Sequence, residues 1–467
     1  MLSFFRVNDP YRMLGVCALL LLIRLPFWLS SAPLMLPELS WMLLGERLAE
    51  GHRLYAGVWD DVGPLSAVVY GILEALFNRQ RWVYTVLAVL LTIYQSLIFN
   101  DFLRARKAYR ESTYVPALIY GLLMSFSFDF YTLSPVLMSL TGVLLAFRNT
   151  FDRIEGTLRD GQILRSGIFV GVAALFHLPA VLFVVPVFYA YMLFASLSPR
   201  RALLLVYGAV LPFAVALTYF YLVETASGFM HQYVLAYGYM TNHHYVKGLS
   251  LLVILTVALL FFVLSLYKLT KYRRFTIQQA HLQQVMFVNV VVALVATFWV
   301  RELAPFHLLF FVPPFAFFIT HYLLIIQRWW WAELLTALLA ILLPLNGYAL
   351  LFDYFSINRL ARTEALMVQS TAYDALVANK RVLVLGDNLS IYQNAKPATP
   401  YLNWQFASEQ LADLDYFENL SGVYINLTSE MPDLIIDQAD LMPTISERIP
   451  IVKNSYRRAK DKVYVKQ

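Results

Sequence analysis

One stretch near the N-terminus concentrates acidic side chains in an otherwise apolar chain. It reads LPELSWMLLGERLAEGHRLYAGVWDDVGPLSAVVYGI and spans residues 36–72. The acids in this stretch are Glu38, Glu46, Glu50, Asp60 and Asp61, and they outnumber its bases. A carboxylate held in a partly desolvated pocket can serve as a general base toward a hydroxyl group. Glu38, directly after the first apolar run, is the best-placed candidate base, with Asp60 and Asp61 as further catalytic candidates.

Other candidate residues lie far along the chain from this loop. Asp129, in SFDFYTL, is a fourth candidate catalytic acid. Arg, Lys and protonated His can neutralise a phosphate without a metal, and the candidates for that role are Arg301, His307, His177 and Lys247. Trp41 and Tyr55 offer flat aromatic faces to a substrate.

A metal site is not predicted from the histidines. His243 and His244 are adjacent, so they do not share a helix face, and the sequence offers no third ligand beside them. The acids of the loop could alternatively hold a divalent cation such as Mg²⁺ or Mn²⁺, so a cation stays open as a cofactor.

Each acidic candidate also has a purely structural interpretation. Glu38 could serve only as an acid at a helix start. Asp60 and Asp61 could be turn residues before Gly63 and Pro64. Asp129 could be a solvated helix end.

The basic candidates have structural alternatives too. His177 lies within an apolar run, where a histidine commonly packs with a hydrogen-bond partner. Arg301 could pair with Glu302 or anchor at lipid headgroups.

The composition of the chain indicates whether these residues lie in a soluble protein or in a membrane protein. Hydrophobic residues make up 60% of the chain, charged residues 14%, and the mean hydropathy is +0.60. Soluble domains have about 45–50% apolar and about 25% charged residues. The chain is therefore predicted to be a polytopic α-helical membrane protein. Its single cysteine, Cys17, excludes a disulfide framework.

The positions of the spans follow from apolar runs, and their direction from basic loops. Eleven spans are predicted: one following Arg12, then 82–100, 113–129, 133–147, 166–179, 180–197, 202–223, 249–267, 284–300, 306–326 and 331–352. Lys and Arg collect before the first span, at 101–112, at 198–201 and at 268–274. These segments should be cytoplasmic, like the N-terminus. Successive spans can cross the membrane in alternating directions and leave all these basic segments cytoplasmic only if the short segment 64–77 does not cross. We therefore predict that 64–77 is a juxtamembrane helix on the outer surface. The net positive charge then reflects topology, and no nucleic-acid partner is expected.

The chain divides by composition near residue 352. Residues 1–352 are predicted to form the transmembrane domain, with the acidic first external loop at about 34–80. Residues 353–467 read as a small extracytoplasmic α/β domain, with strands expected at 381–386, 421–426, 432–436 and 462–466. This tail has no glycine-rich phosphate loop, so it is expected to assist at the outer surface rather than to catalyse.

The first external loop resembles that of the GT-C integral-membrane glycosyltransferases, in particular protein O-mannosyltransferases and lipid A aminoarabinose transferases. In those enzymes an acidic pair opens the loop, followed by a helix, G-x-x-x-Y and a D-x-x-P-P-L turn. The matching positions here are Glu38, Gly51, Tyr55, Asp60 or Asp61, Pro64 and Leu65.

Three later segments extend the resemblance. They are GVAALFHLPAVLFVVP, with His177 where the family commonly has a lysine; RELAPFHLLFFVPPFAFF, with Arg301 and His307; and the external tail from VLVLGDN onward. The resemblance implies transfer of a sugar from a polyprenyl-phosphate donor to a lipid, glycan or protein acceptor. It places the enzyme in the bacterial cytoplasmic membrane, with the basic candidates on the donor phosphate.

One position departs from the family pattern. The first acid of the family pair aligns with Pro37, which leaves only Glu38. A second hypothesis is therefore a catalytically silent relative that acts as a binding or scaffold subunit of an envelope complex. A third is a lipid or small-molecule transporter, against which stand the few intramembrane charges and the lack of an inverted repeat.

Overall fold

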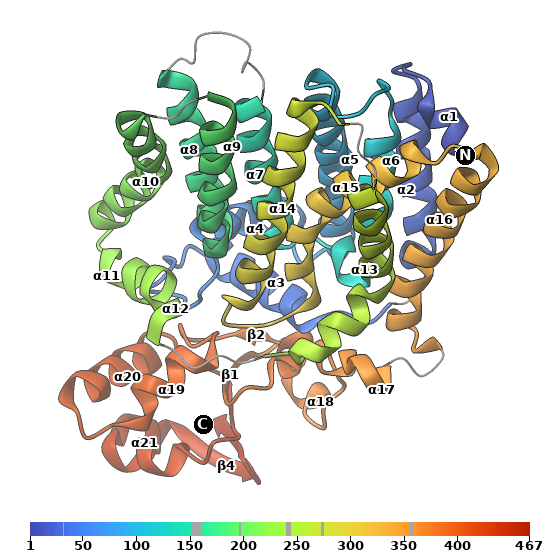
Figure 1. Cartoon of the computed structure of the whole chain (residues 1–467). Helices are drawn as coiled ribbons and strands as arrows, with labels where there is room; N and C mark the ends of the chain where they lie inside the picture. The colour runs from blue at the N-terminus through green and yellow to red at the C-terminus, as the bar shows by residue number, and fades with distance from the viewer. Residues whose placement is uncertain (31, 152–159, 196–197, 240–243, 272–274, 355–357) are drawn as a thin grey trace. The chain divides into compact units, whose positions relative to one another are not determined.

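A computed structural model describes residues 1–30, 32–151, 160–195, 198–239, 244–271, 275–354 and 358–467 (Figure 1). His243 lies outside these ranges. The chain forms two compact units, each assembled from three segments. The first unit comprises Met1–Ala32, Arg81–Ala216 and Asn242–Ala365, and the second comprises Pro33–Gln80, Leu217–Thr241 and Leu366–Gln467.

The first unit is a helical bundle. Its described helices and short 3₁₀ segments are α1 (Leu2–Arg6), α2 (Arg12–Leu29), α5 (Arg81–Ala105), α6 (Val115–Leu123), η1 (Phe128–Tyr131), α7 (Pro135–Phe151), α8 (Asp160–Phe176), η2 (Leu178–Phe183), α9 (Val184–Ala195), α10 (Pro199–Leu222, whose last residues belong to the second unit), α13 (Gly248–Lys271), α14 (Ile277–Phe298), η4 (Pro305–Phe311), α15 (Val312–Ile325), α16 (Trp329–Leu351), α17 (Asn358–Ala361) and η6 (Thr363–Leu366, whose last residue belongs to the second unit). The long helices run side by side in alternating directions (Figure 1). The end of α5, the end of α13 and the start of α14 therefore lie at one end of the bundle, as expected for connections rich in Lys and Arg on one side of a membrane.

Seven described helices are long and apolar enough to cross a membrane, judged by length and composition. They are α2, α5, α10, α13, α14, η4 with α15, and α16. The protein is therefore a multi-pass membrane protein. The other four predicted spans also fall on helices, but these are shorter: α6 has 9 residues, α7 and α8 have 17 each, and α9 has 12.

The largest difference from the predicted spans concerns 113–129. Helix α6 ends at Leu123, and the chain then turns before α7 begins at Pro135. The Asn346 side-chain amide donates 2.8 Å to the Phe126 carbonyl, which satisfies one backbone group that the interrupted helix leaves open. Asp129 consequently lies in the turn η1 instead of at a helix end.

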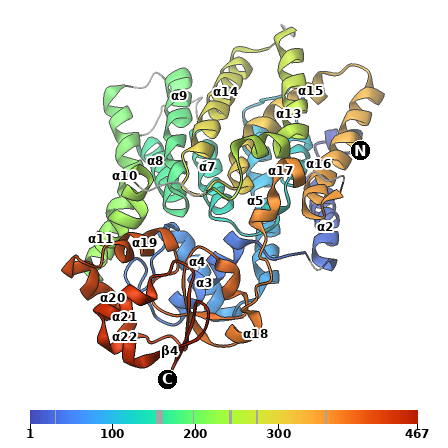
Figure 2. The same ribbon diagram turned by 90° about the horizontal axis from the view of Figure 1, so that it is seen from below.

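The second unit joins the first external loop to the C-terminal tail (Figure 2). Its helical elements are α3 (Leu36–Ala49), α4 (Pro64–Phe77), α11 (Ala226–Gly228), the π-helical η3 (Phe229–Leu235), α12 (Ala236–Tyr239), α18 (Asp374–Val377), η7 (Leu389–Gln393), α19 (Trp404–Ala412), α20 (Phe417–Ser429), α21 (Met442–Arg448) and α22 (Pro450–Ser455). Because loop and tail share one compact unit, both must lie on the same side of the membrane. The segment 64–77 is the 14-residue helix α4.

The tail contains a five-stranded sheet in the order β2-β1-β3-β5-β4. The strands are β1 (Arg381–Leu385), β2 (Lys396–Pro397), β3 (Leu434–Asp437), β4 (Tyr456–Lys460) and β5 (Val463–Lys466). β1 pairs in parallel with β2 and β3, and β5 pairs antiparallel with β3 and β4. Three of the four predicted strands are confirmed. The fourth, 421–426, is wrong: it lies within α20, where Val423 and Leu427 are buried one helical turn apart.

The core of the tail includes a residue from the first external loop. Trp59 packs against the cluster that contains Leu383, Ile435 and Tyr401, and its ring meets Tyr401 edge-on with centroids 5.2 Å apart. The Trp59 amide donates 2.8 Å to the carbonyl of Pro400. The first external loop thus folds together with the tail as one structural unit.

Candidate functional site

Three short 3₁₀ segments of the first unit hold candidate residues at irregular helix ends. Pro179 and Pro305 open η2 and η4, and Pro135 follows η1. Proline cannot donate an amide hydrogen bond, so it interrupts helices and fixes where they start. These interruptions place Asp129, His177 and His307 in turns of the bundle.

Asp129 is fully buried in η1. Its Oδ1 accepts a 2.5 Å hydrogen bond from the Ser127 hydroxyl, and the Phe306 amide of η4 also donates to the carboxylate. Oδ2 is buried without a hydrogen-bond partner among the described residues. The solvated-helix-end interpretation of Asp129 is therefore wrong. A buried acid with one unused oxygen can accept a proton or a hydrogen bond from a bound molecule.

His177 and His307 meet in the same unit. Their ring centroids lie 5.2 Å apart, and Phe310 packs beside His177. Nδ1 of His307 lies 3.0 Å from the Ala304 carbonyl oxygen, whereas Nε2 of His177 is buried without a partner in the described part of the chain. The hydrogen-bonded packing alternative for His177 thus accounts for its ring contacts but not for Nε2. The structure brings Asp129, His177 and His307 together, because the Phe306 amide links η4 to Asp129.

Arg301 and Lys247 flank these turns on neighbouring connections. The Leu303 amide donates 3.2 Å to Nδ1 of His244, and the Val246 amide donates 3.2 Å to the Leu303 carbonyl. The segment before α13 therefore packs on the segment before η4. Arg301 is 1% exposed, whereas Lys247 is exposed. Protein atoms cover Arg301, so it is not a headgroup anchor at the surface.

Sequence reasoning missed Arg24 as a site candidate. It is buried in α2, where Nη2 donates 3.0 Å to the Thr92 hydroxyl and the guanidinium lies 5.0 Å from the ring centre of Tyr131 in η1. Nε and Nη1 have no hydrogen-bond partner among the described residues. Its position in the middle of an apolar span could have indicated a functional residue, because burying a charge within a membrane span costs free energy and such residues commonly have a functional role.

Glu38 belongs to the second unit. Helix α3 begins at Leu36, with Pro37 in its first turn, where the missing amide hydrogen costs nothing. Glu38 follows as the third residue, so the helix-start interpretation is correct for its position. The side chain is nevertheless fully buried, which a simple helix-start acid does not require.

The two aromatic candidates are both packed within the second unit. Trp41 stacks on Tyr70 of α4 with centroids 5.8 Å apart and planes 8° apart. Tyr55 is buried in an aromatic cluster with Phe220 and Tyr233, and its hydroxyl donates 2.8 Å to the Val62 carbonyl. Structural roles are evident for both; contact with a substrate stays a prediction.

Asp60 and Asp61 stand before the start of α4. Oδ1 of Asp60 accepts a 2.9 Å hydrogen bond from the Val62 amide, which confirms its turn role. The Asp60 amide donates to Gln232, whose side chain donates 3.0 Å to the Tyr55 carbonyl. Burial, together with the neighbouring Asp61 carboxylate, raises the pKa of Asp60 above its ordinary value. Asp60 therefore tends to hold a proton under conditions where an exposed aspartate is ionised.

Comparison with known structures decides the fold. No protein-family profile and no curated protein sequence matches the chain. The crystal structure of ArnT from Cupriavidus metallidurans bound to undecaprenyl phosphate, however, matches 97% of this chain and 97% of its own, with a TM-score of 0.55 and 13% identity. The chain has the GT-C fold.

Another solved structure resembles the chain more distantly. The oligosaccharyltransferase of Archaeoglobus fulgidus, in its apo form, matches 96% of this chain and 73% of its own, with a TM-score of 0.48 and 11% identity. The archaeal enzyme AglB in complex with an inhibitory peptide and a dolichol-phosphate matches with a TM-score of 0.45.

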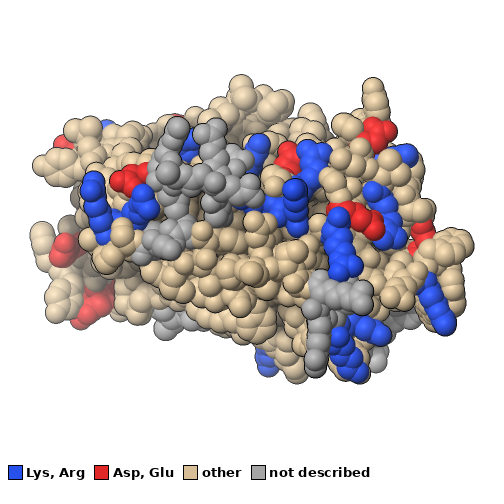
Figure 3. Space-filling view, turned by 45° about the horizontal axis from the view of Figure 1, so that its top comes forward, with Lys and Arg blue, Asp and Glu red and all other residues tan. Residues whose placement is uncertain are grey.

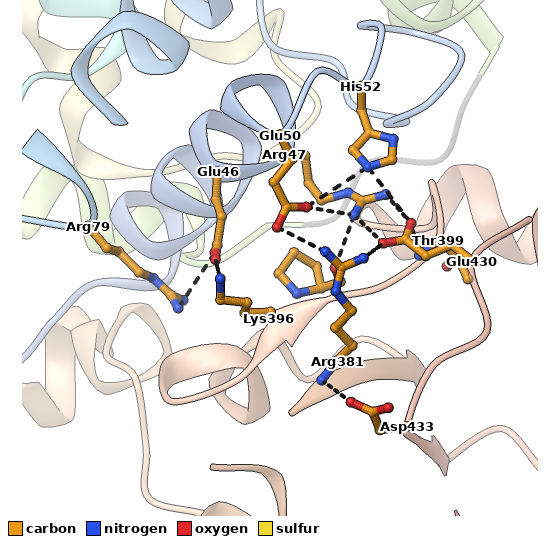
Figure 4. A network of polar contacts seen from close by, with 11 residues as sticks. Glu46, Arg47, Glu50, His52, Arg79, Arg381, Lys396, Thr399, Glu430 and Asp433 are labelled. Carbon is orange, nitrogen blue, oxygen red and sulfur yellow. Dashed lines mark hydrogen bonds and ion pairs between the residues drawn. The ribbon is translucent and has the colours of Figure 1, made fainter. Parts of the chain in front are cut away.

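The second unit contains a dense ionic network between loop and tail (Figure 4). Arg47 of α3 binds Glu430 through two hydrogen bonds of 2.8 and 2.5 Å, and it binds Glu50 at 3.2 Å. Arg381 of β1 contacts both of these glutamates. Glu430 also accepts a 3.2 Å hydrogen bond from the Thr399 amide.

The same network includes one group with spacing suited to a metal. Ligand atoms of Glu50, His52 and Glu430 lie within 4.8 Å of one another. Both carboxylates already bind the guanidinium groups of Arg47 and Arg381. Two fixed positive charges beside the ligands oppose a divalent cation, so these residues do not fit one.

Proposed function

We propose that the protein transfers a sugar from a polyprenyl-phosphate-linked donor to an acceptor at the outer face of the bacterial cytoplasmic membrane. The observation behind this proposal is the cluster of Asp129, His177 and His307. It offers a carboxylate oxygen and an imidazole nitrogen, both buried and without a hydrogen-bond partner among the described residues, in a chain with the GT-C fold. The similar ArnT structure contains undecaprenyl phosphate, which supports a donor of this class.

The proposed reaction needs a base and an anion site. The acceptor oxygen bonds to the anomeric carbon of the sugar while the bond from that carbon to the phosphate oxygen breaks. A carboxylate takes the acceptor proton, and Glu38 and Asp129 are the candidates, with Asp60 in reserve. The released phosphate is negatively charged and would be stabilised by Arg301, His307, His177 or Lys247.

The decisive experiment measures transfer in membranes from a radiolabelled polyprenyl-phosphate sugar. Glu38→Gln keeps size and hydrogen bonding but removes the base, so turnover should fall by about 10²–10⁴-fold if Glu38 is that base. Glu364→Gln, an exposed acid of the first unit, is the matched control and should retain full activity. Full activity in Glu38→Gln would leave Asp129 or Asp60 as the base.

A silent scaffold subunit is the second candidate function, and Pro37 favours it. In related enzymes an acid is expected where this chain has Pro37, and here the proline starts α3. Transfer by the natural protein, which has no acid at position 37, separates the two functions. A transferase that uses Glu38 should be active, whereas a silent relative should show no transfer from any donor tested.

We further propose that the N-terminus is cytoplasmic and the second unit extracytoplasmic. Support comes from the basic connections at one end of the bundle. Single cysteines at Lys107 and Glu409, both exposed, test this after Cys17 is replaced by alanine. In intact cells an impermeant thiol reagent should label position 409 only; labelling of position 107 would reverse the orientation.

A further inference from the structure

A cavity of about 590 Å³ opens at the basic end of the helical bundle. It lies where α13 and α15 end and α16 begins, and Lys268, Lys271, Ile325, Arg328, Trp331 and Leu335 line it. Lys and Arg side chains are gathered on this face of the molecule (Figure 3). Asp129, His177 and His307 are elsewhere in this unit, at the turns η1, η2 and η4, and η4 leads into the opposite end of α15.

The described lining of this cavity carries a net positive charge, although Lys271 also lines an adjoining cavity that contains Glu111. The described lining of the first cavity contains three bases, Lys268, Lys271 and Arg328, and no acid. The nearest acid along α16, Glu333, is already bound by the amino-terminus at 2.6 Å and by the Leu2 and Ser3 amides. Lys271 contacts only a neutral partner in the described structure, the Tyr267 hydroxyl and ring. An anion is therefore the missing partner.

The remaining walls of the cavity are apolar. Ile325 and Leu335 provide aliphatic surface, and Trp331 provides an indole ring. A free inorganic anion gains nothing from such walls, whereas a molecule with a charged head and a hydrocarbon tail uses both kinds of surface.

The depth of the cavity matches a lipid headgroup. Its lining comes from the ends of three candidate membrane spans: α13 ends at Lys271, α15 ends at Ile325 and α16 begins at Trp329. Helix ends of spanning segments lie in the interfacial layer, where Trp, Lys and Arg are common. Basic pockets between spans on the cytoplasmic side bind anionic headgroups.

We propose that this cavity binds the phosphate headgroup of an anionic bilayer phospholipid. The three basic side chains contact the phosphate, and the first acyl methylenes lie along Ile325, Leu335 and Trp331. This site is separate from the proposed donor site, and its existence does not depend on the transfer reaction.

Lipid binding to the purified full-length protein provides the test. Native mass spectrometry would follow titration with phosphatidylglycerol, with phosphatidylcholine as the lipid that has no net charge. The variant Lys268→Gln/Lys271→Gln/Arg328→Gln should bind phosphatidylglycerol about 10- to 100-fold more weakly at low salt, since each base near an anionic lipid surface contributes to affinity. Phosphatidylcholine binding should not change.

A matched control removes the same charge elsewhere. Arg148, Arg165 and Arg200 are exposed bases of the same unit outside the cavity. Replacing all three by glutamine should leave phosphatidylglycerol affinity unchanged. Equal loss in both variants would show general charge attraction and overturn the site.

Two further results would also overturn the proposal. One is equal affinity of the natural protein for both lipids. The other is displacement of phosphatidylglycerol by inorganic phosphate at equal concentration, which would indicate a site for a free anion. The melting temperatures of both variants show whether each is folded.

Discussion

Buried arginines and acids of the two units differ in how far their charges are compensated. In the second unit, Arg47 is almost fully covered, and carboxylates and a backbone carbonyl bind both terminal nitrogens of its guanidinium, so that only its Nε lacks a hydrogen-bond partner among the described residues. In the first unit, Asp129 and Arg24 are equally covered, and each keeps buried polar atoms that no described residue satisfies.

This difference separates structure from function. A compensated ion pair fixes the position of the elements that it joins, and breaking it leaves a buried charge without a partner. An uncompensated polar atom costs stability and is retained where a bound molecule completes it. We therefore regard the Arg47 network as the joint between loop and tail, and the Asp129 cluster as the place where chemistry is expected.

Asp129→Asn should produce the largest effect. The change preserves shape and the partnership with Ser127 but removes the acid, so transfer should fall by about 10²–10⁴-fold. The melting temperature should stay the same or rise, because a buried charge disappears. The transfer assay and a thermal melt on the same preparation check both. Loss of folding with loss of activity would make Asp129 a structural residue.

Arg47→Ala should instead damage stability. It leaves Glu430 and Glu50 without their buried partner, and breaking a buried pair costs roughly 3–5 kcal/mol. The loss should appear in unfolding of the second unit, followed by protease sensitivity of the tail. Arg381→Ala is the control: its side chain is 44% exposed, and an exposed pair contributes about 0–1 kcal/mol. Equal destabilisation would mean that burial does not distinguish the two arginines.

Gly45→Ala tests how closely α3 and α4 pack. A Cβ at Gly45 would lie 2.7 Å from the Tyr70 carbonyl oxygen. The helices would have to separate, at a cost of about 1–3 kcal/mol. Gly161→Ala, where no atom lies within 4 Å of the added carbon, should have little effect on the melting temperature.

Glu74→Gln should change how stability depends on pH. Burial, and next the Glu46 carboxylate, raise the pKa of Glu74 to about 7, against the opposing effect of Arg79 and Lys396. An unfolded glutamate has a pKa of about 4.3. Between these values the folded protein holds more protons, so stability is greatest at low pH and falls as pH rises to about 7.

In Glu74→Gln this decline should become shallower, and the variant should melt at a higher temperature than the natural protein at pH 8. Thermal melts from pH 5 to pH 8 measure the slope. An unchanged slope would show that Glu74 is ionised throughout that range.

Much of the fold was predictable because its signals are local. Each predicted span overlaps a helix, although 113–129 is helical only as far as Leu123, since apolar length is read from consecutive residues. The segment 421–426 was wrong because a short apolar run is ambiguous between strand and helix. Strand β4 was missed because YRRAK is charged, and its pairing with β5 is what makes it a strand.

The candidate site was less predictable. Residue types suggested Asp129, His177 and His307, but not that the turns η1, η2 and η4 would bring them together. The pairing of Arg47 with Glu430 joins positions 383 residues apart, and neither position alone indicates the other. The sequence shows that Arg24 lies within an apolar run, but it does not show that Arg24 lies close to Tyr131. That proximity arises because α6 ends at Leu123 and the chain then forms the turn η1, which contains Tyr131.

The joint between loop and tail also imposes an order on biosynthesis. The ribosome releases α3 and α4 early, yet their partners in β1, β2 and the Glu430 segment are made last. While the intervening spans are synthesised, the partners of Arg47 and Trp59 in the tail do not yet exist, so the loop remains incompletely folded. Such long sequence separation makes folding slow and leaves apolar surface open to aggregation. The final hundred residues thus complete the folding of the loop, and in a chain truncated before them the loop could not finish folding.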